Sequence, residues 1–270
     1  MTTVADAAAA VERLWPISGS EAWDAPGLLS GDPSATVTRI LLAVDAVADT
    51  VDEAIDVGAE VLLVHHPLLL RGVTTVAEST AKGAVLARLI RGGCALLAAH
   101  TNADIVETGT SARLASLLGL QDAVPIVETA PGVGLGRVGA LPEPTTLGAL
   151  ARRLAGILPP TATGVRVAGA FDRAVQTIAV CGGAGDSLLG EPAVLAADAY
   201  ITADLRHHPA SEAVESARVA GGPALIDVSH WASEWLWLET AAAELRAELP
   251  GVEVVVSDLR TDPWDFVVVQ

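Results

Sequence analysis

The stretch Val61-Leu-Leu-Val64-His65-His66-Pro67 places two adjacent histidines at the end of an apolar run. Side chains alternate across a β-strand, so adjacent histidines within one strand would face opposite ways. Pro67 lacks a backbone donor and pushes His66 toward an extended or turn geometry. We therefore predict that the strand ends at Val64 and that the turn carries both imidazoles over the C-terminal edge of the sheet. Open α/β sheets bind their ligands at that edge, and two neutral imidazoles held there indicate a metal site.

Strands and helices alternate on both sides of this stretch. In the first half we predict strands at 38–44, 61–64 and 94–99, and helices at 50–58, 81–91 and 110–118. Such a βαβ order is typical of a largely parallel sheet that is covered on both faces. The segment 125–144 is rich in glycine and proline, and we predict that it forms loops.

A second α/β pattern follows this segment. We predict strands at 164–167, 176–180, 199–202, 224–228 and 253–257, and helices at 147–158, 188–197, 211–220 and 233–249. The string Cys181-Gly-Gly-Ala-Gly-Asp-Ser187 is interpreted as a strand-to-helix turn.

The two halves share an order of elements that leads to a His-His-Pro string, at 65–67 and again at 207–209. This similarity predicts an α/β fold of two similar three-layer α/β domains with mixed, largely parallel sheets, consistent with a duplication. We assign residues 1–125 plus 224–270 to a metal-binding domain and residues 126–223 to a second α/β domain.

Composition excludes several classes of protein. No apolar run approaches the roughly 18–20 residues of a membrane span, and the N-terminus lacks the basic start of a secretory signal, so we expect a soluble cytoplasmic protein. Cys94 and Cys181 are the only cysteines, which favours reduced thiols over a disulfide framework. The net charge of −17 with a single lysine, Lys82, argues against extended nucleic acid as a partner. A small-molecule substrate, including a nucleotide, remains compatible with this charge.

All six histidines fall into four short segments at predicted strand ends: 65–66, 100–104, 204–208 and 230–234. The carboxyl ends of parallel strands can converge on one crevice. His230 and Glu234 stand four residues apart at a predicted helix start, which puts both on one face. Each segment alone is explained as well by a cap or a surface residue. Their coincidence favours a site for divalent transition ions.

Seven motifs carry a family resemblance. They are Trp23-Asp24 with Gly27-Leu28, His65-His66-Pro67, His100-Thr101-Asn102 with Asp104, Gly134-Leu-Gly136-Arg137-Val-Gly139, Cys181-Gly182-Gly183 with Gly185, Thr202 with Asp204 and His208, and His230 with Glu234. In this order they resemble the Ngg-interacting-factor-three-like dinuclear-metal proteins, often labelled GTP cyclohydrolase type 2 homologues. Two positions depart from the family pattern: Ala25 replaces an asparagine and Ala203 replaces a glycine.

The resemblance implies a two-domain α/β chain that assembles into a toroidal homohexamer with two divalent ions per subunit. It implies the metal ligands His65, His66, Asp104, His230 and Glu234. The ion type is left open among Zn, Mn, Fe, Co and Ni, because mixed imidazole and carboxylate sites accept several metals. We expect His100 or His208 to act as a general acid or base, and Arg137 to hold a phosphate.

The expected activity is that of a dinuclear metal-dependent hydrolase that uses metal-activated water. Opening of the purine ring of GTP and hydrolysis of a phosphoester would use the same ions, and the residues do not separate them. The alternative from another class is a non-catalytic metal-binding, metal-delivery or scaffold ring. A structural metal site is closed by protein ligands, whereas a catalytic site keeps a position for water.

Overall fold

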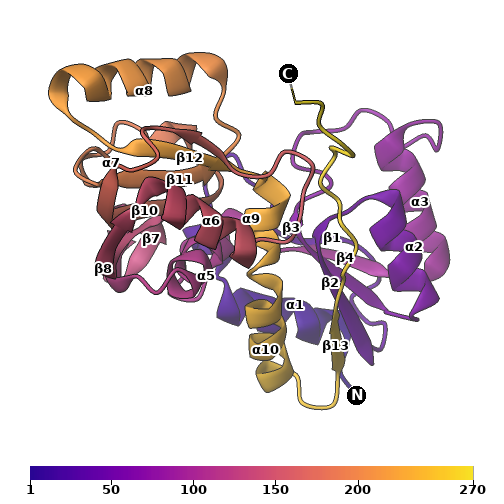
Figure 1. Ribbon diagram of the computed structural model, residues 1–270. Helices are drawn as coiled ribbons and strands as arrows, with labels where there is room; N and C mark the ends of the chain where they lie inside the picture. The colour runs from indigo at the N-terminus through magenta and orange to yellow at the C-terminus, as the bar shows by residue number, and fades with distance from the viewer. Residues whose placement is uncertain (270) are drawn as a thin grey trace. The chain divides into compact units, whose positions relative to one another are not determined.

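The computed structural model describes residues 1–269, which form two compact units. Unit 1 comprises Met1–Ala103 and Leu238–Thr261, and unit 2 comprises Asp104–Trp237 and the C-terminal residues from Asp262. Each unit is an α/β structure built on its own mixed sheet, of five and six strands (Figure 1). No helix within residues 1–269 is long and apolar enough to cross a membrane.

The sheet of unit 1 has the strand order β1-β4-β3-β2-β13. Its strands are β1 (Gly27–Ser30), β2 (Arg39–Asp45), β3 (Val61–His66), β4 (Ala95–Ala98) and β13 (Glu253–Val256). β1 runs antiparallel to β4, and the other neighbours are parallel. The helices of unit 1 are α1 (Val4–Leu14), α2 (Ala48–Asp56), α3 (Ala81–Gly92) and α10 (Leu238–Glu248), with a 3-10 turn at Ile17–Gly19.

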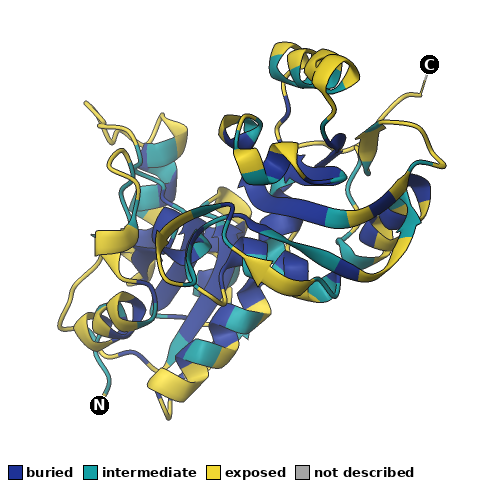
Figure 2. Cartoon of the chain, turned by 90° about the vertical axis from the view of Figure 1, so that its left-hand side faces the viewer, coloured by how far each residue is buried: buried dark blue, intermediate teal, exposed yellow. Residues whose placement is uncertain are grey.

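Helices cover both faces of this sheet. Val51 of α2 and Leu89 of α3 pack with Leu62 of β3 in one buried cluster. Because strand side chains alternate, the buried residues Ile40 and Leu42 face the opposite side of the sheet from their neighbours Leu41 and Ala43. Helix α10 packs against β2 and β13, and it also contacts α1. The strands are dark blue along most of their length in Figure 2, whereas the outer helix faces are exposed. Unit 1 is therefore three-layered.

The sheet of unit 2 has the strand order β5-β8-β10-β11-β12-β9. Its strands are β5 (Gln121–Val124), β8 (Arg137–Thr146), β9 (Arg166–Ala168), β10 (Ala174–Ala184), β11 (Ala199–Ala203) and β12 (Ala224–Val228), and a separate ribbon pairs β6 (Val127–Ala130) with β7 (Val133–Leu135). Only the β10–β11 and β11–β12 pairs are parallel among the five pairings of this sheet.

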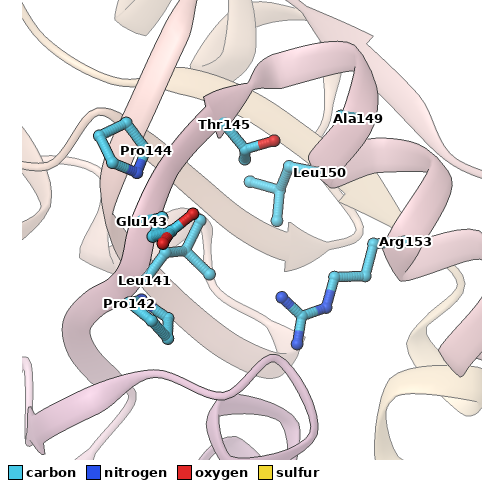
Figure 3. A pocket seen from close by; sticks show the side chains of 8 residues that line it. All are labelled: Leu141, Pro142, Glu143, Pro144, Thr145, Ala149, Leu150 and Arg153. Carbon is cyan, nitrogen blue, oxygen red and sulfur yellow. The ribbon is translucent and has the colours of Figure 1, made fainter.

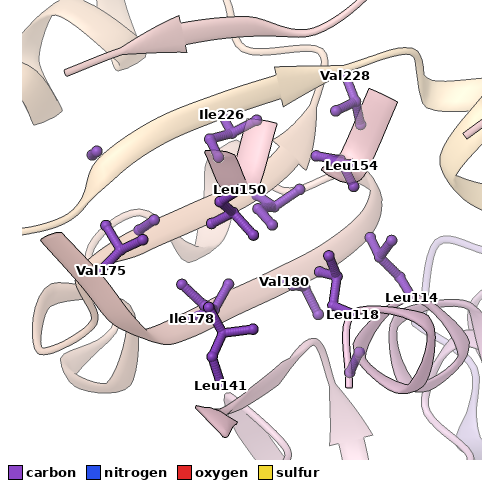
Figure 4. Close-up of a cluster of buried hydrophobic side chains, with 14 of the residues drawn as sticks. Leu114, Leu118, Leu141, Leu150, Leu154, Val175, Ile178, Val180, Ile226 and Val228 are labelled. Atoms are coloured by element: carbon purple, nitrogen blue, oxygen red, sulfur yellow. The ribbon is translucent and has the colours of Figure 1, made fainter. Parts of the chain in front are cut away.

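Two apolar clusters lie around this sheet. The helices of unit 2 are α5 (Thr110–Leu117), α6 (Leu147–Ile157), α7 (Pro192–Leu195), α8 (His207–Ala220) and α9 (His230–Trp235). The short helix α4 (Thr101–Asp104) ends at Asp104, which is the first residue of unit 2. Leu114 of α5 and Leu150 of α6 belong to the same buried cluster as Ile178 of β10 and Ile226 of β12 (Figure 4). Val194 of α7 belongs to a second cluster, against which α8 rests. Unit 2 is also three-layered, as the sequence predicted, but its sheet is mostly antiparallel and not largely parallel.

Several predicted elements differ from the structure. The predicted helix 188–197 is a 3-10 turn at Asp186–Leu188 followed by α7, and the predicted helix 211–220 begins earlier, at His207. β3 continues through His66 instead of ending at Val64. The segment 125–144, predicted as loops, contains strands. β8 accommodates its prolines in a bulge: Ala140 pairs with Thr177 and Thr145 with Val175, so residues 141–144 have no partner in that register. β10 runs through Ala184, into the segment 181–187 that was predicted to form a turn. The predicted helix 233–249 is instead two helices, α9 and α10.

The unit boundaries also differ from the predicted ones. α5, expected in the first domain, contributes Leu114 to the core of unit 2. β12, also expected there, pairs with β11 in the second sheet. Pairing across a sheet joins segments that are distant in sequence, and a linear pattern does not reveal it. The two His-His-Pro strings also occupy different places: the first ends strand β3, whereas the second begins helix α8.

Candidate metal centre

Adjacent histidines at the end of β3 reach toward different neighbouring strands. His65 is buried, and its Nδ1 lies 2.8 Å from the carbonyl oxygen of Ala99, just after β4. His66 stands opposite Asp45 in the parallel register with β2, and its Nδ1 lies 2.7 Å from Asp45 Oδ1. The Thr261 hydroxyl donates to the other oxygen of Asp45. Asp45 therefore holds the imidazole of His66 in one orientation.

His100 follows β4 and is held by a carboxylate from far away in the sequence. Its Nδ1 lies 2.8 Å from Asp24 Oδ1. The second oxygen of Asp24 accepts from the backbone N–H and the hydroxyl of Thr101. Burial of Asp24 opposes ionisation, but the hydrogen bonds from His100 and Thr101 outweigh it and hold the pKa of this carboxyl well below its usual range. Asp24 therefore fixes the orientation of His100 as a charged acceptor, a role that the sequence analysis missed.

The three imidazoles of unit 1 form a candidate metal-binding group. One ligand atom from each of His65, His66 and His100 lies within 4.8 Å of the others. Each Nδ1 faces an oxygen that accepts hydrogen bonds, so the neutral ring carries its proton on Nδ1 and keeps a lone pair on Nε2. Three Nε2 atoms with lone pairs suit a divalent transition ion. The donor set of unit 1 thus fits the metal that the sequence predicts.

Unit 2 holds a second donor pair at the start of α9. Ser229 caps this helix by accepting from the backbone N–H of Ala232. His230 lies 2.9 Å from Asp204 Oδ2 through Nδ1 and 2.9 Å from Glu234 Oε1 through Nε2. Burial lowers the pKa of His230, but the charges of Glu234 and Asp204 prevail and raise it to about 11. A cation that binds His230 and Glu234 must therefore displace a proton.

The chain of β10 passes close to this pair. Gly183 has φ +69°, and a Cβ there would lie 2.4 Å from Glu234 Oε1. Its backbone N–H donates to the Ser233 hydroxyl at 2.9 Å. A glycine is required at this position both by the backbone conformation and by the space that Glu234 occupies.

The remaining predicted site residues have different surroundings. Asp104 ends α4 and accepts a hydrogen bond from the Thr110 hydroxyl at the start of α5. His208 is exposed in the first turn of α8, where its ring packs against that of His207 at 5.2 Å. The expectation for Arg137 is wrong: its guanidinium is buried and donates to backbone carbonyls, including Gly134 O at 2.6 Å and Val106 O at 2.7 Å, so it is unavailable to a phosphate.

Two other features lie outside these donor groups. Both cysteines are free and buried, and burial raises the pKa of each thiol to about 12, so neither supplies a thiolate at neutral pH. A pocket of unit 2 lies between β8 and α6, with Arg153 and Glu143 at its edge (Figure 3). None of the predicted site residues lines this pocket.

An α/β chain with three imidazoles gathered at the C-terminal ends of parallel strands has the features of a metal-binding protein. A family model described as Duf34/NIF3 (NGG1p interacting factor 3) matches residues 2–263. The chain belongs to this family, as the sequence resemblance indicated.

Relatives and solved structures agree with this assignment. A GTP cyclohydrolase 1 type 2 homolog from Streptomyces coelicolor is 47% identical over 98% of this chain and 94% of the relative. A protein of the same name from Mycobacterium tuberculosis is 35% identical over 97% of each chain. The structure of a hypothetical protein from Staphylococcus aureus superposes with a TM-score of 0.87 at 26% identity over 98% of this chain and 99% of the other. A Bacillus cereus protein related to NIF3 shares the fold, with a TM-score of 0.88 at 22% identity over 99% of each chain.

Proposed function

We propose that this chain is a dinuclear, divalent-metal-dependent hydrolase. The observation that carries the proposal is the group of three imidazoles in unit 1. In each ring Nδ1 faces a hydrogen-bond acceptor, so that Nε2 carries the lone pair that can coordinate a metal. His230 and Glu234 of unit 2 are a second donor set. Together with Asp104 they complete the ligands that the family resemblance implies for two ions. We extend the proposal to a homohexamer, as the resemblance implies.

When bound, divalent ions supply Lewis acidity and lower the pKa of a coordinated water toward neutrality. The chain itself supplies orientation. Asp24, Asp45 and Asp204 each fix one imidazole through its Nδ1, which sets the tautomer and raises the basicity of the ring. We assign His100 to metal binding, since it lies within the imidazole group. His208 is then the proposed general acid or base.

An exposed tryptophan favours a planar heterocyclic substrate over a simple phosphoester. The side chain of Trp23 is 59% exposed, and its ring lies edge-on to that of His100, with centroids 5.8 Å apart. The next residue, Asp24, is fixed by His100 and Thr101, so the backbone that carries the indole is anchored beside the imidazole group. Indole rings stack on nucleobases. The relatives' name, which refers to GTP, agrees with a purine substrate.

Metal analysis with an activity panel tests the proposed function. We expect the purified protein to hold up to two equivalents of Zn, Mn, Fe, Co or Ni, and to hydrolyse GTP or a phosphoester only with its metal present. Chelation should abolish the reaction, and one of these ions should restore it. Metal-replete protein that is inactive on GTP and on a broad panel of phosphoesters would contradict the hydrolase and favour a metal-binding or delivery ring.

Substitution of Trp23 by leucine tests the class of substrate. Base stacking contributes about 1–3 kcal/mol, so Trp23→Leu should weaken binding of guanosine nucleotides by about 5- to 150-fold and leave ribose 5-phosphate unaffected. Trp264→Leu is the matched control, because this indole is 61% exposed and belongs to unit 2. Equal nucleotide affinity in both variants, measured by titration calorimetry, would exclude Trp23 as a stacking platform.

A further inference from the structure

Arg137 is a buried cation whose guanidinium donates hydrogen bonds to backbone carbonyls. Its residue is 4% exposed at the start of β8. One terminal nitrogen donates to Gly134 O at 2.6 Å and Gly136 O at 2.7 Å. The other donates to Val106 O at 2.7 Å and Ile105 O at 3.4 Å. Burial of a guanidinium costs desolvation free energy unless its N–H groups are hydrogen-bonded. The hydrogen bonds to these four carbonyls offset that cost.

The local backbone is shaped to present these carbonyls. Gly136 has φ +63°, and a Cβ there would lie 2.6 Å from Ile126 Cδ1. Gly134 also donates its N–H to Ile105 O at 2.9 Å. The glycine-rich motif and Arg137 therefore both donate hydrogen bonds to the segment 105–106.

That segment directly follows Asp104, the carboxylate that the proposed function assigns to metal binding. The side chain of Asp104 is held by the Thr110 hydroxyl, and its backbone runs into the two carbonyls that Arg137 binds. A guanidinium spans these acceptors with a rigid planar fork, which an ammonium cannot do. Small displacements of a ligand are costly to a site whose geometry must be preorganised.

We infer that Arg137 is a positioning residue that holds Asp104 ready for a divalent cation. The inference rests on the proposed metal centre and assigns Arg137 no contact with the ion or the substrate. Partners that orient metal ligands typically change metal affinity by about 10- to 100-fold when they are removed. The expected effect of losing Arg137 lies in that range.

Titration of the full-length protein with Zn²⁺ or Mn²⁺ tests this inference, with thermal unfolding measured in parallel. We expect Arg137→Met to weaken binding by about 10- to 100-fold and Arg137→Lys to restore part of the loss. Arg173→Met is the matched control, because this arginine of unit 2 also donates to a carbonyl, Gly222 O at 2.8 Å. It should retain wild-type affinity. If Arg137→Met does not fold, Arg137→Lys carries the comparison.

A double variant separates positioning from general stability. If Arg137 acts through Asp104, Arg137→Lys should change the affinity little in an Asp104→Ala background. Wild-type affinity in both Arg137 variants, or an equal loss in Arg173→Met, would overturn the inference while the metal centre stands. A wild-type protein that binds neither ion would overturn the metal centre and this inference together.

Discussion

Replacing His66 with alanine should weaken divalent-cation binding by at least about 100-fold. Loss of a residue that orients a metal ligand lowers metal affinity by about 10- to 100-fold, and loss of the ligand itself should cost at least as much. His66 is one of the three imidazoles whose ligand atoms lie within 4.8 Å. It is only half-buried at the end of β3, and its removal leaves the core residues Leu62 and Val64 in place. The fold should therefore survive with a change of about 1 kcal/mol or less. Metal titration and urea unfolding measure the two effects separately.

Two further variants define how the effect arises. Asp45→Asn keeps an oxygen that can accept from His66 Nδ1 but removes the charge, so an intermediate loss of about 10-fold is expected. His207→Ala removes an exposed histidine at the start of α8 and should leave metal binding unchanged. Retention of wild-type stoichiometry and affinity by His66→Ala would exclude this residue as a ligand.

The parallel strands β2, β3 and β4 could be predicted from the sequence because they depend on local apolar runs and short connections. The location of His65 and His66 at a sheet edge followed from the same pattern. Pro67 was expected to end the strand earlier, but Asp45 lies opposite His66 in register and extends the pairing with β2. Each of the two side chains turns toward a different neighbouring strand, and one ligand atom of each lies within 4.8 Å of the other.

The contacts that complete the site were less accessible to sequence analysis. Asp24 and His100 are 76 residues apart, and no periodicity in the chain connects them. The arginine of the glycine-rich motif suggested a phosphate-binding residue, since the motif does not show that four carbonyls surround its guanidinium. The bulge in β8 was equally hidden, because prolines normally indicate loops.

Replacing Gly183 with alanine should both destabilise the protein and impair metal binding. A residue with a side chain at φ +69° costs about 1–2 kcal/mol. The new Cβ would also lie 2.4 Å from Glu234 Oε1, a separation that forces the carboxylate to move. Glu234 is buried and pairs with His230 Nε2 at 2.9 Å, so its displacement should add about 1–3 kcal/mol. Urea unfolding and metal titration report the two losses.

Gly164→Ala separates the two causes. Gly164 has φ +59°, but a Cβ there meets nothing within 4 Å, so its replacement carries the backbone cost alone. The difference in unfolding free energy between the two variants then measures the contact with Glu234, and only Gly183→Ala should reduce cation affinity, by about 10-fold or more. Equal behaviour of the two variants in both measurements would show that Glu234 can move without loss. In that case its position beside His230 would not be required for binding a cation, and the donor set of unit 2 would lose its main support.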